Sequence, residues 1–210
     1  MISLTKKFIF VHIYKTAGSS VRDALKEYFP RVARRKRFIN NLLQTVAGKK
    51  LFFEQLAQHA TAMDYKEYLE EKYDSYFKFA FVRNPFDWEV SQYQFAVQTP
   101  VHPQYELFRS MPFGEYIRWR CREAPVYQLD FVSGSDGSMI VDRIGKFETL
   151  ERDFASICAT LGIRAQLRHI NQSRRGKAAL YYDEDTRKLV ADTFARDFEA
   201  FGYSKEIEGR

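Results

Sequence analysis

The chain has few cysteines and no long apolar run, and each shortage excludes a class of protein. Its two cysteines, Cys121 and Cys158, cannot make a disulfide scaffold and lack the paired spacing of a zinc site. No apolar stretch approaches the roughly 18 residues that a membrane-spanning helix needs. The apolar stretch behind Lys6 and Lys7 is also too short for a signal peptide. We therefore expect a cytoplasmic protein with reduced thiols and no bound metal.

The composition is that of an ordinary globular protein. Hydrophobic residues make up 45% and charged residues 29% of the 210 positions, which excludes a disordered or collagen-like chain. This length fits one domain, which we expect to span residues 1–206. Residues 207–210 read IEGR, resemble an engineered protease-cleavage sequence and are left out of the predicted fold.

Positive charge is concentrated in the first quarter of the chain. Residues 1–50 contain 12 Lys or Arg and 2 Asp or Glu, whereas the whole chain has a net charge of only +6. The run from Arg34 to Arg37 supplies much of this excess. Such a run is most often a solvated face, and the alternative is contact with a nucleic acid or a sulfated glycan.

Two strand-to-helix turns dominate the predicted secondary structure. Residues 8–13 (FIFVHI) and 77–82 (FKFAFV) are apolar runs typical of buried strands. Apolar residues at helical spacing follow the first run, and Pro30 closes that helix. After the second run, Asn84 suits an N-cap and Pro85 suits the first helical turn.

The rest of the sequence predicts several helices and one hairpin. A helix is expected over residues 64–72, with Asp64 and Glu67 as a capping box. Asp136-Gly137 predicts a hairpin between residues 129–132 and 139–144. Three further helices are expected, around residues 113–120, over 150–161 and over 189–201, the last two ended by Gly162 and Gly202. Together the patterns predict an α/β fold with a central, largely parallel sheet flanked by helices.

The loop after the first strand is rich in small and hydroxyl-bearing residues. It reads Lys15, Thr16, Ala17, Gly18, Ser19 and Ser20. Gly18 lets the backbone approach an anion, while Lys15, the hydroxyls and the N–H groups of a helix start supply positive charge and donors. Lys15 precedes the glycine, so the loop is not a Walker A motif. The pattern indicates a phosphate site, and the alternative is an ordinary loop with an exposed lysine.

The second turn places an arginine at the end of a strand. Arg83 ends the second predicted strand, and Ser91 lies roughly 10 Å further along the helix axis, so one anion could contact both side chains. The alternative is that Arg83 pairs with Asp87 while Ser91 faces solvent. Ligands of open α/β sheets bind beyond the carboxyl ends of the strands. The two turns together therefore predict a ligand with two separate anionic groups.

These two motifs resemble those of sulfotransferases. Residues 11–21 (VHIYKTAGSSV) are similar to the family's 5′-phosphosulfate loop, and residues 79–93 (FAFVRNPFDWEVSQY) to its 3′-phosphate motif. The resemblance is closest to the bacterial branch of sulfotransferase family 2, which is related to Golgi carbohydrate sulfotransferases. It extends over further stretches of the chain, at residues 59–69, 136–154, 169–190 and 197–204.

The resemblance implies a P-loop-like fold and a defined donor. Family members transfer the sulfuryl group of 3′-phosphoadenosine 5′-phosphosulfate (PAPS) to an acceptor, release adenosine 3′,5′-bisphosphate (PAP) and need no metal. Carried over to this sequence, the catalytic lysine is Lys15. The residues implied in donor binding are Lys15, Thr16, Ala17, Gly18, Ser19 and Ser20 for the 5′-phosphosulfate, Arg83 and Ser91 for the 3′-phosphate, and Ser173, Arg174 and Arg175 in a later basic loop. The family usually has a proline at the position of Tyr14, where it would stiffen the start of the loop.

Sulfuryl transfer to a hydroxyl also requires a base. His59 is the candidate, because imidazole titrates near neutral pH and its position resembles that of the family's histidine base. His12, His102 and His169 are weaker options, and His12 in a buried strand favours a structural role. The alternative for His59 is a surface or packing histidine.

The sequence does not identify the acceptor. A hydroxyl compound is expected, and a carbohydrate or an anionic glycan would suit the basic first quarter, while no nucleic acid partner is expected. Two other functions stay open on the residues alone. One is a P-loop-type nucleotide kinase or other phosphotransferase, and the other is a non-catalytic polyanion-binding protein.

Overall fold

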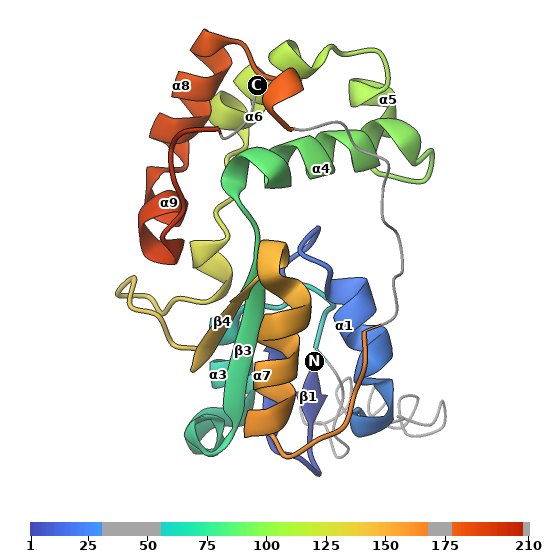
Figure 1. The fold of residues 1–210 in the computed structure, drawn as a ribbon, viewed down its shortest axis with the longest axis vertical. Coiled ribbons are helices and arrows are strands. Elements are labelled where there is room, and N and C mark those ends of the chain that lie inside the picture. Colours follow the sequence, from blue (N-terminus) through green and yellow to red (C-terminus); the bar gives the residue numbers. More distant parts are fainter. Residues whose placement is uncertain (31–55, 168–177, 208–210) are drawn as a thin grey trace, which may run out of the picture.

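The computed structural model describes residues 1–30, 56–167 and 178–207 (Figure 1). Its sheet has four strands, in the spatial order β1 (Ile2–Ser3), β2 (Phe8–Val11), β3 (Phe77–Val82) and β4 (Arg143–Lys146). β1 is antiparallel to β2, whereas β3 is parallel to both β2 and β4. The predicted α/β fold with a largely parallel sheet is therefore confirmed.

Both faces of the sheet are covered by helices. Successive side chains of a strand point to opposite faces. One face carries Phe8, Phe10, Phe79 and Phe81, which are buried together with residues of α1 (Gly18–Ala24) and α7 (Leu150–Thr160). The other face carries Ile9, Val11, Ala80 and Val82, which pack with α3 (Ala62–Leu69). Burial on both sides explains why the strand sequences are continuous apolar runs.

A second group of helices lies beyond the carboxyl end of β3 (Figure 1). It comprises α4 (Pro85–Gln98), α5 (Tyr105–Phe108), α6 (Phe113–Glu123), α8 (Glu184–Thr193) and α9 (Ala195–Phe201). Phe86 of α4 is buried in the core of this group, whereas Trp88 of the same helix belongs to the core beneath the sheet. Because α4 follows β3 directly, it joins the two cores at the edge where β3 ends.

Short 3-10 helices complete the described chain. They are η1 (Lys26–Tyr28), η2 (Glu70–Ser75), η3 (Leu129–Phe131), η4 (Phe147–Thr149) and η5 (Ala178–Leu180). Several predicted boundaries are confirmed. β3 spans the predicted residues, Asn84 caps α4 by accepting a hydrogen bond from the Phe86 N–H at 3.0 Å, and Pro85 opens that helix.

The prediction for the capping box at residues 64–72 is wrong. The helix begins two residues earlier, and the box is formed by Thr61 and Asp64 rather than by Asp64 and Glu67. The Asp64 N–H donates to the Thr61 hydroxyl at 3.2 Å, and the Thr61 N–H donates to the Asp64 carboxylate at 2.6 Å. Threonine is a good N-cap because its hydroxyl accepts from the orphan N–H groups of the first turn.

The predicted hairpin and the predicted last helix also need correction. Residues 129–131 form η3, and only one bridge, Ser133 to Met139, joins the two arms of the turn at Gly137. β4 instead pairs with β3 in parallel, at the end of the sheet away from β1. The last helix is interrupted at Phe194 and forms α8 and α9, although Gly202 does end α9 in the left-handed conformation.

Candidate donor and catalytic site

The two predicted anion-binding turns lie at one edge of the sheet. β2 and β3 are parallel neighbours with Val11 opposite Ala80, so their carboxyl ends emerge on the same side. Arg83 directly follows β3, and the loop of residues 14–17 follows β2. Contacts also join the two turns, since the Trp88 indole N–H of α4 donates to the Tyr14 carbonyl at 2.7 Å.

The loop after β2 has an uncommon backbone conformation. Lys15 and Ala17 have positive φ angles of 62° and 66°, in the left-handed region where side chains other than glycine are strained. The Ala17 carbonyl accepts from the N–H groups of Ser20 and Val21 at 3.0 and 3.1 Å, which closes the loop onto α1. Such strain costs about 1–3 kcal/mol per residue and is typical of ligand-binding turns.

A close approach between Gly18 and His12 explains the glycine of the loop. A Cβ atom at position 18 would lie 1.7 Å from the His12 ring, so the histidine occupies the space that a side chain would need. His12 is only 3% exposed, and burial lowers its pKa to about 3, with His59 adding to the shift. A neutral, buried ring beneath the loop favours packing, although β2 ends one residue before His12 and not beyond it as predicted.

The other loop side chains divide between the interior and the surface. Thr16 is fully buried and donates its hydroxyl to the Ile13 carbonyl at 2.8 Å, which closes the loop from inside. Ser20 is nearly buried, whereas Ser19 is exposed. The Lys15 ammonium lies 4.0 Å from the centre of the Phe95 ring on α4, a contact of the cation–π type.

Arg83 is buried at the start of the second turn. Its guanidinium stacks 4.1 Å from the centre of the Phe147 ring, and one of its nitrogens lies 3.7 Å from the Asp87 carboxylate. The pairing with Asp87 that the sequence left open is therefore present. Ser91, however, does not face solvent: it is 1% exposed, and its hydroxyl has no hydrogen-bond partner among the described residues. Such an orphan hydroxyl costs about 1–3 kcal/mol, so it indicates a position where a ligand could supply a partner.

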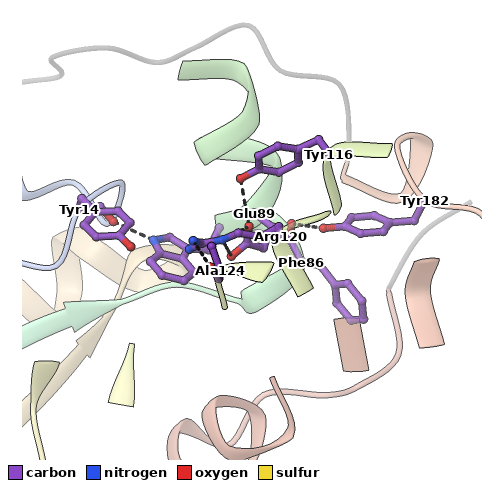
Figure 2. A network of polar contacts seen from close by, with 8 residues as sticks. Tyr14, Phe86, Glu89, Tyr116, Arg120, Ala124 and Tyr182 are labelled. Carbon is purple, nitrogen blue, oxygen red and sulfur yellow. Dashed lines mark hydrogen bonds and ion pairs between the residues drawn. The ribbon is translucent and has the colours of Figure 1, made fainter. Parts of the chain in front are cut away.

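A buried network holds Tyr14, which stands where the family usually has proline. The Tyr14 ring stacks on the Trp88 ring with centroids 5.2 Å apart, and the Trp88 indole N–H donates to the Tyr14 carbonyl (Figure 2). Arg120 of α6 pairs with the fully buried Glu89 at 3.2 Å. Burial raises the pKa of Tyr14 and of Glu89, and the Arg120 guanidinium opposes both shifts. Packing and buried charge thus fix the backbone that a proline ring would stiffen.

The described histidines near Lys15 differ in which nitrogen carries the proton. The His59 Nδ1 lies 2.9 Å from the His12 carbonyl, which can only accept, so Nδ1 is protonated and Nε2 has the lone pair. The His102 Nδ1 instead accepts the Gln104 N–H at 3.2 Å, so the neutral ring is protonated at Nε2. Burial, and secondly Lys15, lower the pKa of His102. His59 is exposed with the lone pair on Nε2, whereas the Nε2 of neutral His102 carries the proton.

Some predicted site residues lie outside the described part of the chain. These are Ser173, Arg174, Arg175 and His169, together with the basic run from Arg34 to Arg37. No helix that the structure describes could cross a membrane. Within residues 1–30, 56–167 and 178–207, His, Cys, Asp and Glu side chains do not gather in threes as a metal site would require.

The sequence analysis missed several residues of this site. Phe95 and Phe147 each contact one of the two predicted cations, and Trp88 holds the loop through Tyr14. Glu89, a charged residue between Trp88 and Val90 on a largely buried helix, was the one visible signal of a buried ion pair. A cleft of about 790 Å³ between α1 and α7 is lined by neither Lys15 nor Arg83.

Comparison with known proteins supplies the family. The family model described as "Sulfotransferase family" matches residues 1–204, nearly the whole chain. A search of curated proteins found no match. The matched family has a P-loop-like fold, in agreement with the parallel sheet and the strand–loop–helix turn after β2. The chain therefore belongs to the sulfotransferase family.

Proposed function

We propose that this protein transfers the sulfuryl group of PAPS to a hydroxyl group of an acceptor. The observation that carries the proposal is the presence of two basic turns at one edge of the sheet, after the parallel neighbours β2 and β3. One turn contains Lys15 and the other Arg83. PAPS has an anionic group at each end of its ribose, so a single donor molecule can meet both turns. Membership of the sulfotransferase family supports this donor.

The residues around each turn suit the part of the donor assigned to it. The strained loop of residues 15–20, with Ser19 exposed at its surface, is assigned to the 5′-phosphosulfate. Arg83 and the buried Ser91 hydroxyl are assigned to the 3′-phosphate, where a guanidinium is the preferred partner of a phosphate. Ser173, Arg174 and Arg175 are assigned to the nucleotide by resemblance alone.

The assigned side chains account for an in-line transfer. His59 Nε2 accepts the proton of the acceptor hydroxyl as its oxygen forms a new bond to sulfur. The bond between sulfur and the bridging oxygen then breaks, and Lys15 neutralises the charge that grows on that oxygen. Lys15 must leave the Phe95 ring to do this, at a cost of about 0.5–1 kcal/mol for an exposed cation–π contact.

The acceptor is proposed to be a carbohydrate hydroxyl, with an anionic glycan as the form that suits the basic first quarter of the chain. The side of the loop facing α4 offers an aromatic surface, since Phe95 is 42% exposed and contacts His102 edge-on at 5.5 Å. Exposed aromatic rings pack well against the apolar face of a sugar ring. The resemblance to carbohydrate sulfotransferases supports the same class.

Two measurements test the proposal. Calorimetry should show PAP binding without added metal, and labelled PAPS should transfer its sulfuryl group to at least one member of a panel of glycans and small alcohols. Absence of PAP binding would reject the proposal. Magnesium-dependent turnover of ATP would favour a phosphotransferase instead, and salt-sensitive binding of heparin without turnover would favour a polyanion-binding protein.

A further inference from the structure

Gln128 makes a pair of hydrogen bonds with the backbone of Arg83. Its side-chain oxygen accepts from the Arg83 N–H at 2.8 Å, and its side-chain nitrogen donates to the Arg83 carbonyl at 2.8 Å. Gln128 is 0% exposed, so these bonds are shielded from water. The side-chain amide thus pairs with both polar groups of one residue, as the backbone of a neighbouring strand would do.

This pair of bonds lies where the sheet ends. The ladder between β3 and β4 runs to Val82, which is opposite Lys146, and Arg83 is the next residue. Gln128 therefore fixes the backbone at the point where the chain leaves β3 and turns into α4. The neighbouring Asn84 N–H is held as well, by the Glu148 carboxylate at 2.8 Å.

Gln128 is itself held by a buried carboxylate from α9. Asp197 is 0% exposed, and its two oxygens accept from the N–H groups of Gln128 and Leu129 at 2.8 and 3.0 Å. Burying a carboxylate is costly unless it is well hydrogen-bonded. Asp197 holds the backbone of Gln128, and the Gln128 side chain holds the backbone of Arg83. The cost of burying Asp197 indicates that the position of this turn matters.

We propose that Gln128 is a positioning residue for the 3′-phosphate of the donor, acting through the backbone of Arg83 with Asp197 as its support. An arginine side chain has several rotatable bonds, so its guanidinium is placed well only if its backbone and its packing surface are both fixed. Gln128 fixes the backbone, and the Phe147 ring supplies the surface. This inference rests on the proposed function, because it assigns Gln128 to the 3′-phosphate half of PAPS.

A comparison of two nucleotides separates this role from a general structural one. PAP carries both the 5′- and the 3′-phosphate, whereas AMP lacks the 3′-phosphate. Calorimetric titration of the whole chain with each ligand yields the ratio of the two affinities, which reports the contribution of the 3′-phosphate alone. In Gln128→Met, which loses both bonds, we expect PAP affinity to fall by about tenfold while AMP affinity stays within about twofold.

Two further variants complete the experiment. Gln128→Glu can still accept from the Arg83 N–H but cannot donate to its carbonyl, so it should lower the PAP:AMP ratio even if Gln128→Met does not fold. Tyr73→Phe is the matched control, because it removes a buried hydrogen bond of 2.8 Å, to the Ile140 carbonyl, near the other end of β3. It should leave the ratio unchanged.

The outcomes separate the two proposals. A ratio that falls in the Gln128 variants and not in Tyr73→Phe supports the positioning role. Equal losses of PAP and AMP affinity, or an unchanged ratio in both Gln128 variants, would overturn it while leaving the proposed function intact. A wild-type protein that binds PAP no better than AMP would overturn the assignment of the 3′-phosphate to Arg83, and with it the role of Gln128.

Discussion

The loop at Lys15 and the turn at Arg83 lie at the same edge of the sheet but are built differently. The loop has two residues with positive φ and is held by ring packing, with Trp88 against Tyr14 and His12 against Gly18, and by the hydrogen bonds of Thr16 and Trp88. The turn begins with a regular N-cap at Asn84, and the Gln128 amide fixes its backbone. The loop therefore has a strained backbone, whereas Arg83 and Asn84 in the turn have no positive φ and are held by side chains from distant parts of the chain.

This difference matches the two tasks that we assign. The ammonium of Lys15 must move from the Phe95 ring toward the oxygen at which charge develops. The guanidinium of Arg83 only has to hold a phosphate whose charge does not change during transfer. We infer that the loop is the part that affects turnover, and the turn the part that affects donor affinity.

Removing the charge of the loop should have the largest effect. Lys15→Ala is expected to lower kcat by about 1,000-fold, because a charge that stabilises the leaving oxygen acts mainly in the transition state. PAP affinity should change far less, and the melting temperature should stay near that of the wild type because the Lys15 side chain is only half-buried and lies outside the three hydrophobic cores. Initial rates with saturating PAPS, together with PAP calorimetry, measure both. A variant that keeps near-normal kcat would exclude Lys15 from the chemistry.

Replacing the proposed base should have the next largest effect. His59→Ala is expected to lower kcat by about 100-fold or more, because the acceptor proton then lacks a positioned base. His102→Ala is the matched control, since the His102 Nδ1 lone pair is occupied by the Gln104 N–H, and it should lose less than about tenfold. Initial rates at saturating PAPS measure the loss in each variant. The reverse ranking would make His102 the base.

The free energy of unfolding should depend on pH through Asp197, the buried carboxylate that supports the Arg83 turn by way of Gln128. Burial raises the pKa of Asp197 to about 6 from an ordinary value of 3.8. Because the folded protein holds this proton more tightly than the unfolded chain, the contribution of Asp197 to stability is greatest below pH 4 and falls as the pH rises to about 6. The difference in free energy of unfolding between wild type and Asp197→Asn should therefore change by about 3 kcal/mol over this window. Urea titrations of both proteins at several pH values measure this difference. A difference that does not change with pH would contradict the raised pKa of Asp197.

A smaller effect is expected from loosening the start of the loop. Trp88→Phe keeps an aromatic ring against Tyr14 but removes the donor to the Tyr14 carbonyl, a loss of about 1 kcal/mol. We expect kcat to fall by about fivefold with no change in the PAP:AMP affinity ratio, the opposite of the Gln128 variants. Trp119→Phe is the control, because Trp119 packs on Phe108 within the helical group. A changed PAP:AMP affinity ratio in Trp88→Phe would contradict the inference that the loop affects turnover and the turn affects donor affinity.

The sequence predicted the parts of this site that are local. The strand–loop–helix order after β2 and the N-cap at Asn84 depend on neighbours within one or two helical turns, as does the Arg83–Asp87 pair, which the sequence offered only as the alternative to anion binding. The supports were not predictable, because Trp88 and Tyr14 are 74 residues apart and Gln128 and Arg83 are 45 apart. No periodicity or spacing relates such pairs, and only the tertiary fold brings them together.

A crystal structure with PAP bound tests the central claim most directly. We predict one nucleotide across the edge of the sheet, with its 5′-phosphate on the backbone of residues 16–20 and its 3′-phosphate within hydrogen-bond distance of both the Arg83 guanidinium and the Ser91 hydroxyl. The Arg83 backbone should keep both bonds to Gln128. A nucleotide that contacts only one of the two turns, or that binds elsewhere on the molecule, would contradict the account.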